Sequence, residues 1–149
     1  MRILFALGAI LPAACVPAPE AGIGTDAALT GGAATHFPRQ TASQWRTGQE
    51  AVLAGRLSVQ GGCLTLVSGA AASPIVWHPE ARLSDDGRRV IDTRTRREVA
   101  VGAAVALVGG MRARAEVSAA EAQAWNLPAH CTGDSILLVG VGFHEQDNR

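Results

Sequence analysis

Residues 51–67 read AVLAGRLSVQGGCLTLV, and the rest of the predicted fold is built around this stretch. Leu53, Leu57 and Val59 alternate with polar or small residues, which is the period-two pattern of a half-buried β-strand. The glycine pair after the first arm reverses the chain, and the apolar alternation then resumes. The stretch therefore predicts a β-hairpin whose returning arm begins at Cys63, where a disulfide could tie it to a distant segment.

Length and composition limit what the protein can be. A chain of 149 residues suits one domain with a small core. Hydrophobic residues make up 48% but aromatic residues only 4%, so small aliphatic side chains should fill the interior, without a large ligand cavity. The 13 arginines, with no lysine, balance 13 acidic residues. This balance gives no overall field to attract nucleic acid.

The first residues have the features of an export signal. An arginine follows the initiator methionine, and the apolar run 3–11 is too short to span a hydrocarbon layer of about 30 Å as a helix. The next residues, PAAC, resemble the lipobox of bacterial lipoproteins. The resemblance implies a signal peptide over 1–14, a lipid on Cys15 and a membrane-anchored protein that faces the periplasm. Cleavage and release as a soluble periplasmic or secreted protein is the alternative.

The segment after Cys15 is rich in proline, glycine and alanine and shows no sustained period. It predicts a flexible linker over 15–48, since a lipid-anchored domain needs a spacer from the membrane surface. Trp45, near the end of this segment, is expected to dock on the edge of the folded domain.

The rest of the chain reads as short strands separated by turn residues. Pro79 should end the strand that contains Trp77, which is expected to lie in the core. Two further apolar runs flank a polar, charged connection and predict a second hairpin. The strands expected between the first hairpin and residue 117 are 74–77, 89–92, 98–101, 104–108 and 111–117.

One helix and one long strand complete the chain. Ser118 and Glu121 have the spacing of a capping box and predict a short helix that runs to about residue 125. The run 136–143 is apolar on both faces, so it should be a central or barrel-closing strand. Short strands without βαβ alternation predict an all-β fold, a small closed or partly open β-barrel with an OB-like barrel as one candidate, over 49–144. Residues 145–149 are expected to be a disordered tail.

Between residues 56 and 140 the chain carries four landmarks: Gly62-Cys63-Leu64, Trp77 near a proline, Val101-Gly102 and a late cysteine. With these landmarks it also loosely resembles a type of small bacterial envelope β domain. The resemblance supports the fold and implies no activity.

The sequence offers few candidates for catalysis. The block around Ser135, GDSI, superficially resembles the nucleophile block of a family of serine esterases. Here, however, the block enters an apolar strand rather than a helix. No Asp-x-x-His pair supplies an acid and a base. Ser135 is therefore interpreted as a loop serine.

The histidines are scattered along the chain, without the short spacing that places two imidazoles on one metal ion. His78 with Glu80, and His130 beside Cys131, could converge in space to bind zinc. Cysteines of exported proteins, however, are more often oxidised than metal-bound. We therefore expect no metal site and no cofactor.

Arginines concentrate around the second predicted hairpin, but acidic residues are interleaved with them and aromatic stacking partners are absent nearby. We therefore expect a solvated, charge-mixed sheet edge rather than a nucleic-acid site. Such an edge also discourages aggregation between strands. The arginines are Arg88, Arg89, Arg94, Arg96 and Arg97, with Arg112 and Arg114 as further candidates.

Three cysteines in an exported chain leave one without a partner. If Cys15 carries lipid, Cys63 and Cys131 remain, and we expect them to form a disulfide. The bond would join the first hairpin to the loop before the last strand.

These observations favour a non-enzymatic cell-envelope lipoprotein whose β domain binds a protein or a polysaccharide. The membrane contact would be the N-terminal lipid. The alternative is a small periplasmic hydrolase or metal-dependent enzyme that uses His78, Glu80 and His130.

Overall fold

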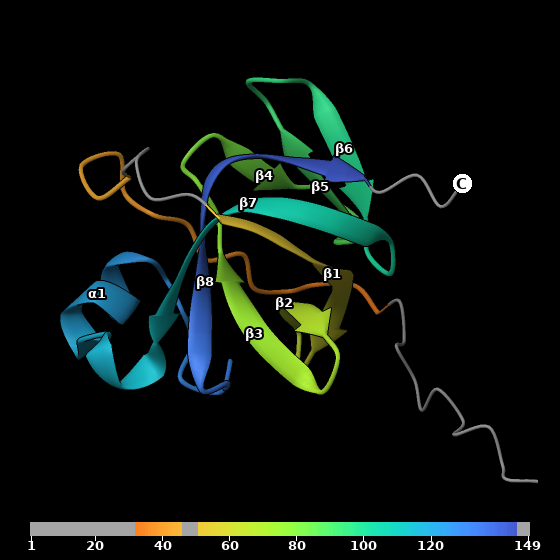
Figure 1. The fold of residues 1–149 in the computed structure, drawn as a ribbon. Coiled ribbons are helices and arrows are strands. Elements are labelled where there is room, and N and C mark those ends of the chain that lie inside the picture. Colours follow the sequence, from red (N-terminus) through yellow and green to blue (C-terminus); the bar gives the residue numbers. More distant parts are fainter. Residues whose placement is uncertain (1–31, 46–50, 146–149) are drawn as a thin grey trace, which may run out of the picture.

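Five strands form a closed barrel in the order β1-β2-β3-β8-β7, and β7 pairs with β1 to complete it (Figure 1). The structure is a computed structural model that describes residues 32–45 and 51–145. It confirms the predicted all-β class and the small closed barrel; five is also the strand number of an OB-fold barrel. The barrel strands are β1 (Ala51–Gln60), β2 (Cys63–Ser68), β3 (Ala71–Val76), β7 (Ala104–Ala113) and β8 (Ser135–Glu145).

The first hairpin forms as predicted. Gln60 pairs with Cys63, so the turn consists of Gly61 and Gly62 alone. Both glycines have positive φ, 57° and 81°, as a tight turn that matches the strand twist requires. Leu57 is fully buried inside the barrel. The sequence therefore determines this turn, because side chains other than glycine rarely adopt two successive left-handed conformations.

Strand β8 closes the barrel, as its two apolar faces predict. It pairs in parallel with β3 and antiparallel with β7. The pairing with β7 is irregular: Leu107 pairs with Phe143, whereas Gly109 pairs with Val139. Residues 140–142 therefore form a bulge in β8.

The prediction of two separate strands, 104–108 and 111–117, is wrong, because β7 continues through Gly109 and Gly110 between them. A Cβ atom on Gly109 would lie 2.1 Å from the carbonyl oxygen of Leu138, so glycine permits a close approach of two strands here. The strand predicted over 111–117 ends early, at Ala113, and a 3₁₀ helix, η1 (Arg114–Glu116), follows.

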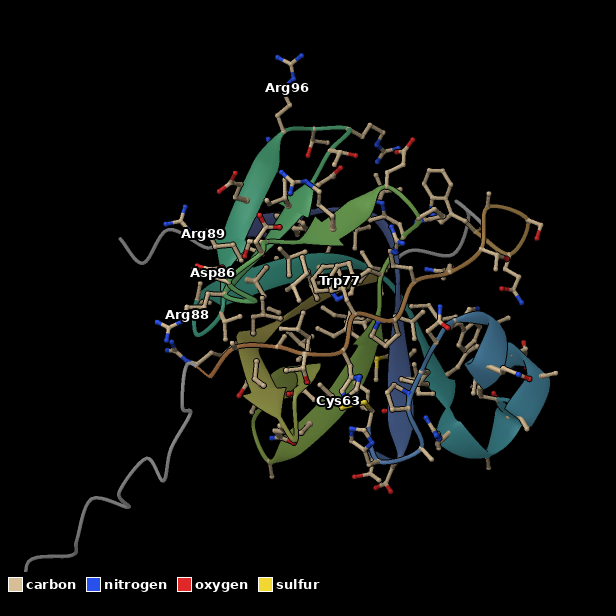
Figure 2. The ribbon with its side chains drawn as sticks, turned by 180° about the vertical axis from the view of Figure 1, so that it is seen from behind. Cys63, Trp77, Asp86, Arg88, Arg89 and Arg96 are labelled. Carbon is tan, nitrogen blue, oxygen red and sulfur yellow. A yellow bond between two sulfur atoms is a disulfide. The ribbon has the colours of Figure 1, made fainter. Side chains whose placement is uncertain are left out.

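A second sheet, with the order β4-β5-β6, lies beside one end of the barrel (Figure 1). It contains the predicted second hairpin, with the charged turn exposed. Val90 and Val99 are buried and join the main core, in which Trp77 is fully buried and Phe143 lies edge-on to it (Figure 2). The expected core position of Trp77 is confirmed. The strands are β4 (Ala81–Leu83), β5 (Arg89–Asp92) and β6 (Arg97–Ala100).

The predicted helix is α1 (Ala119–Ala124), and its capping box is present: Ser118 and Glu121 each accept from the other's backbone N–H. Hydrogen bonds from Arg112 and Ser118 lower the pKa of Glu121 to about 2. Trp125 follows the helix and packs in a second, smaller core with Cys63 and Cys131.

The predicted linker over 15–48 is wrong for residues 32–45, which pack against the barrel. We call these residues the strap. Ala34 donates from its backbone N–H to Gly87, the Trp77 N–H donates to Pro38, and the Gln40 N–H donates to Trp77. The proline- and glycine-rich composition correctly indicates that the strap lacks internal periodicity. This composition does not prevent the backbone of the strap from forming hydrogen bonds with backbone groups of the folded domain.

The expected signal peptide (1–14), Cys15 and the rest of the expected linker lie outside the described residues. Strand β8 includes Glu145, so the expected tail is wrong for that residue, and the other residues of that prediction, 146–149, lie outside the described residues. Within the described residues, no helix has the length and hydropathy needed to cross a membrane.

Candidate functional site

His78 and Asp92 form a pair of ionisable residues in the interior. His78 follows β3, where Pro79 prevents further pairing, and Asp92 is the last residue of β5. Both side chains are 0% exposed, and 3.7 Å separates His78 Nε2 from Asp92 Oδ2. This distance is too long for a hydrogen bond.

The two residues leave several polar atoms without a protein partner. Asp92 Oδ1 accepts from the backbone N–H groups of Arg94 at 2.9 Å and Thr95 at 3.3 Å. Asp92 Oδ2 and both ring nitrogens of His78 are buried and have no hydrogen-bond partner among the described residues. Buried polar atoms of this kind are uncommon in native proteins because desolvation is costly.

The surroundings set the charge of each group. Burial lowers the pKa of His78, against the opposing effects of Asp92 and Glu80, while Arg94 lowers it further. Burial raises the pKa of Asp92, but hydrogen bonds from Thr95 and Arg94 outweigh burial and the net direction is down. At neutral pH the pair is thus a neutral imidazole beside a carboxylate rather than a salt bridge.

Trp45 covers this pair. Its ring stacks on His78 with 6.2 Å between centroids, and its Nε1 donates to the carbonyl of Gly140 at 2.6 Å. The guanidinium of Arg94 lies 5.6 Å from the centre of the Trp45 ring and 3.7 Å from a carboxylate oxygen of Glu80. The expected docking of Trp45 on the barrel edge is confirmed, and its ring lies over the buried imidazole of His78.

The bulge in β8 explains why the Trp45 ring fits there. The carbonyl of Val139 accepts a hydrogen bond from the Gln40 side chain at 2.7 Å, and the carbonyl of Gly140 accepts one from the Trp45 indole N–H. A Cβ atom on Gly142 would lie 3.4 Å from Asp92 Oδ2. The irregular pairing therefore supplies two acceptors for the strap and one wall of the His78–Asp92 pair.

A neutral histidine beside a carboxylate is an arrangement that general bases use. A base must reach the proton that it abstracts, and here Trp45 and the barrel enclose the imidazole. The geometry is therefore that of a buried polar pair, which could act on a substrate only if the strap moved away.

A second cluster surrounds the disulfide. The predicted bond is present: the sulfur atoms of Cys63 and Cys131 are 1.99 Å apart. The rings of His36, from the strap, and His130 meet edge to face with 4.8 Å between centroids. His130 is exposed, whereas both cysteines are buried.

The structure does not bring His78, Glu80 and His130 together as one group of metal ligands. Within the described residues, only Cys63, His130 and Cys131 form a group of three or more potential ligands whose donor atoms all lie within 4.8 Å of one another. His130 therefore belongs to the disulfide cluster.

Ser135 does not meet a histidine within the described contacts. Ser135 is the first residue of β8, so its interpretation as a loop serine is wrong, and its hydroxyl lies 3.2 Å from that of Ser73.

The arginines around β5 and β6 form the expected charge-mixed edge. Arg88, Arg89 and Arg96 point outward in Figure 2, with Asp86 between the first two. Arg89 pairs with Glu98 at 3.3 Å. The edge is solvated, as predicted.

Asp92 was not singled out as a site residue from the sequence. The sequence does contain a pattern that indicates Asp92. In the strand Arg89–Asp92, every second residue lies on the same face, so Asp92 shares the buried face of Val90. A carboxylate in phase with a core residue is a buried charge that needs partners.

Comparisons with known proteins found no matching family model, no similar curated protein and no similar solved structure.

Proposed function

We propose that the protein is a non-enzymatic cell-envelope lipoprotein whose barrel binds a protein partner. The envelope location and the lipid on Cys15 follow from the sequence of the first fifteen residues. The binding role follows from the outer surface of β1 and β7.

The residues of this surface are fixed by strand register. Val52 pairs with Val108 and Ala54 with Ala106, and directly paired residues point to the same side of a sheet. The residues between them, Leu53 and Leu107, face the core. The four outward residues, Val52, Ala54, Ala106 and Val108, are called the β1/β7 face.

The β1/β7 face carries the proposal. Val52 is 69% exposed, the largest exposed fraction of any large hydrophobic side chain among the described residues. None of the four residues carries a charge or a hydrogen-bonding side chain. Val52 and Ala54 are exposed, and Ala106 and Val108 are half-buried. Uncharged, apolar surface is typical of protein–protein contacts, whose centres are depleted of charged residues.

A polysaccharide is less suited to this surface. Sugar rings are recognised by flat aromatic faces and by side-chain hydrogen bonds, and the β1/β7 face has neither. Trp77 and Trp125 are buried, and the ring of Trp45 stacks on His78.

The enclosed His78–Asp92 pair also supports a binding role over catalysis, since a substrate cannot reach the imidazole while the strap is in place.

The test is chemical crosslinking of intact envelopes, followed by purification of the protein and its partner. Val52→Asp places a charge on the β1/β7 face and should abolish the crosslinked partner. Because Val52 is exposed, its replacement should change stability by no more than about 0.5 kcal/mol.

Ala70→Asp is the matched control, since Ala70 is also exposed but lies in the turn between β2 and β3. It should leave the crosslink intact. A partner retained by Val52→Asp, or lost equally in both variants, contradicts the assigned face.

Mass spectrometry of the membrane fraction should find an acylated peptide that begins at Cys15, and a soluble product with a free Cys15 contradicts the lipoprotein assignment.

A further inference from the structure

Residues from three distant parts of the chain converge on the disulfide. His36 comes from the strap, Cys63 begins β2, and His130 and Cys131 lie in the loop between α1 and β8. His36 forms an isolated parallel bridge with Cys63, and its backbone N–H donates to Gly62 at 3.1 Å. The donor atoms of Cys63, His130 and Cys131 lie within 4.8 Å of one another.

The glycines of the first turn hold the histidines close. A Cβ atom on Gly62 would lie 2.3 Å from the Thr35 hydroxyl and 3.4 Å from His36, and one on Gly61 would lie 3.9 Å from His130. Both rings thus pack over a turn that has no side chains. This packing explains how His36 and His130 meet beside the sulfur atoms.

We propose that reduction of the Cys63–Cys131 disulfide turns this cluster into a binding site for a thiolate-preferring divalent cation of the Zn²⁺ class. Cys63, Cys131 and His130 are the ligands, since their donor atoms lie within 4.8 Å of one another. His36 lies outside this group, but its ring meets that of His130 with 4.8 Å between centroids, so a turn of the side chain would bring it to the fourth position. The inference goes beyond the proposed function and does not depend on it.

The donor set fits this ion. Two cysteines and two histidines are a common structural zinc set, tetrahedral with Zn–S of about 2.3 Å and Zn–N of about 2.0 Å. The Cα atoms of the two cysteines are 5.7 Å apart, so both thiolates can reach one ion. The cysteines are buried and His130 is exposed, so the ion can enter from the side of His130.

The oxidised cluster lacks this donor set, because each sulfur is bonded to the other and carries no negative charge. A phosphine reductant breaks the S–S bond: phosphorus loses two electrons and, with one water molecule, becomes the phosphine oxide, and the sulfurs leave as two thiols. In the cell a dithiol would replace the phosphine and be oxidised to its own disulfide. Zn²⁺ then displaces the two thiol protons to solvent, and the imidazoles donate lone pairs.

The experiment uses the full chain with Cys15→Ser, so that Cys63 and Cys131 are the only thiols. After reduction by a phosphine, equilibrium dialysis should find one Zn²⁺ per chain, and none per oxidised chain. Co²⁺ as a probe should show thiolate-to-cobalt charge-transfer absorption. The additional Cys63→Ser/Cys131→Ser changes should abolish both signals.

Histidine variants separate a built site from two exposed thiols. His130→Ala should weaken Zn²⁺ binding at least about tenfold, and His36→Ala should also weaken it. Thr132→Ala is the matched control, because Thr132 is an exposed neighbour of Cys131 without a ligand atom in the proposed set, and it should leave the affinity unchanged. Equal affinity in the parent and in His130→Ala overturns the proposal.

Folding is followed at the same time, because loss of the disulfide destabilises the reduced chain before the metal is added. Trp125 packs with both cysteines, so its fluorescence and the near-ultraviolet circular dichroism report on this core. Zn²⁺ should preserve or restore both signals in the reduced chain. Zn²⁺ bound to a chain that stays unfolded overturns the proposal, as does a reduced, folded chain that binds no more Zn²⁺ than the cysteine double variant.

Discussion

The strap joins two histidine clusters that differ in their access to water. Near its start, His36 meets His130 beside the disulfide, where the His130 ring is exposed. At its end, Trp45 covers His78, which is completely buried with Asp92. The same residue type therefore serves two purposes: an accessible imidazole is a potential ligand, whereas a buried one is held neutral and forms part of the core.

The two clusters differ in whether their donor atoms can react with a ligand from solvent. Near His78 the polar atoms are enclosed, so their main effect is on stability and its dependence on pH. At the disulfide the sulfur atoms are buried but lie beside the exposed His130, so their covalent state decides what this cluster can bind. The following predictions test this contrast.

The largest effect is expected from the disulfide. Cys63 and Cys131 are separated by 68 residues, and a crosslink over this length stabilises the fold by about 4 kcal/mol on the chain-entropy model. Cys63→Ser and Cys131→Ser should therefore lower the thermal midpoint by similar amounts in calorimetry. The Cys15→Ser variant is the control and should keep the parent midpoint. Free thiols at Cys63 and Cys131 in the native protein would contradict the assignment.

An intermediate effect is expected from pH at the His78 pair. The pKa of His78 is lowered from 6.5 in the folded state, so below pH 6.5 the unfolded chain binds more protons than the folded one. The free energy of unfolding should therefore fall as the pH drops through this window, by at most about 1.4 kcal/mol per pH unit for one proton. The lowered pKa of Asp92 adds a similar loss, but only below its usual value of 3.8.

Denaturant unfolding at a series of pH values measures this dependence. His78→Gln should flatten the profile near pH 6. Trp45→Ala should reduce the slope as well, because water that reaches the imidazole brings its pKa closer to 6.5. A slope near pH 6 that is identical in His78→Gln and the parent would assign the dependence to another group.

The smallest effect concerns the turn that follows Asp92. Arg96 has φ of 57°, a left-handed conformation that costs a residue with a side chain about 1 kcal/mol. Arg96→Gly should raise the free energy of unfolding by about 0.5 kcal/mol, since the larger flexibility of glycine in the unfolded chain offsets part of the gain. Arg96→Ala, which keeps the conformational cost, should give no gain. A loss of stability in Arg96→Gly alone would show that the Arg96 side chain is needed.

Local rules explain most of what could be predicted about the fold. The two glycines of the first turn, the period-two runs of β1 and β5, and the Ser118–Glu121 capping box each involve residues close in sequence. The disulfide could be predicted because, with Cys15 assigned to lipid, Cys63 and Cys131 are the only pair of cysteines that remains. The prediction of separate strands on either side of Gly109 was wrong because glycine here serves a close contact with Leu138, which sequence neighbours do not reveal.

The sequence by itself determined the β-hairpins, the capped helix, the apolar closing strand and the cysteine pair, because these depend on local conformational preferences and on period. The packing of residues 32–45 on the barrel, the stacking of Trp45 on His78 and the contact of His36 with His130 arise only in the folded chain. Each of these contacts joins residues far apart in the sequence. Such contacts depend on how the barrel closes and where β8 bulges, and no local pattern encodes that geometry.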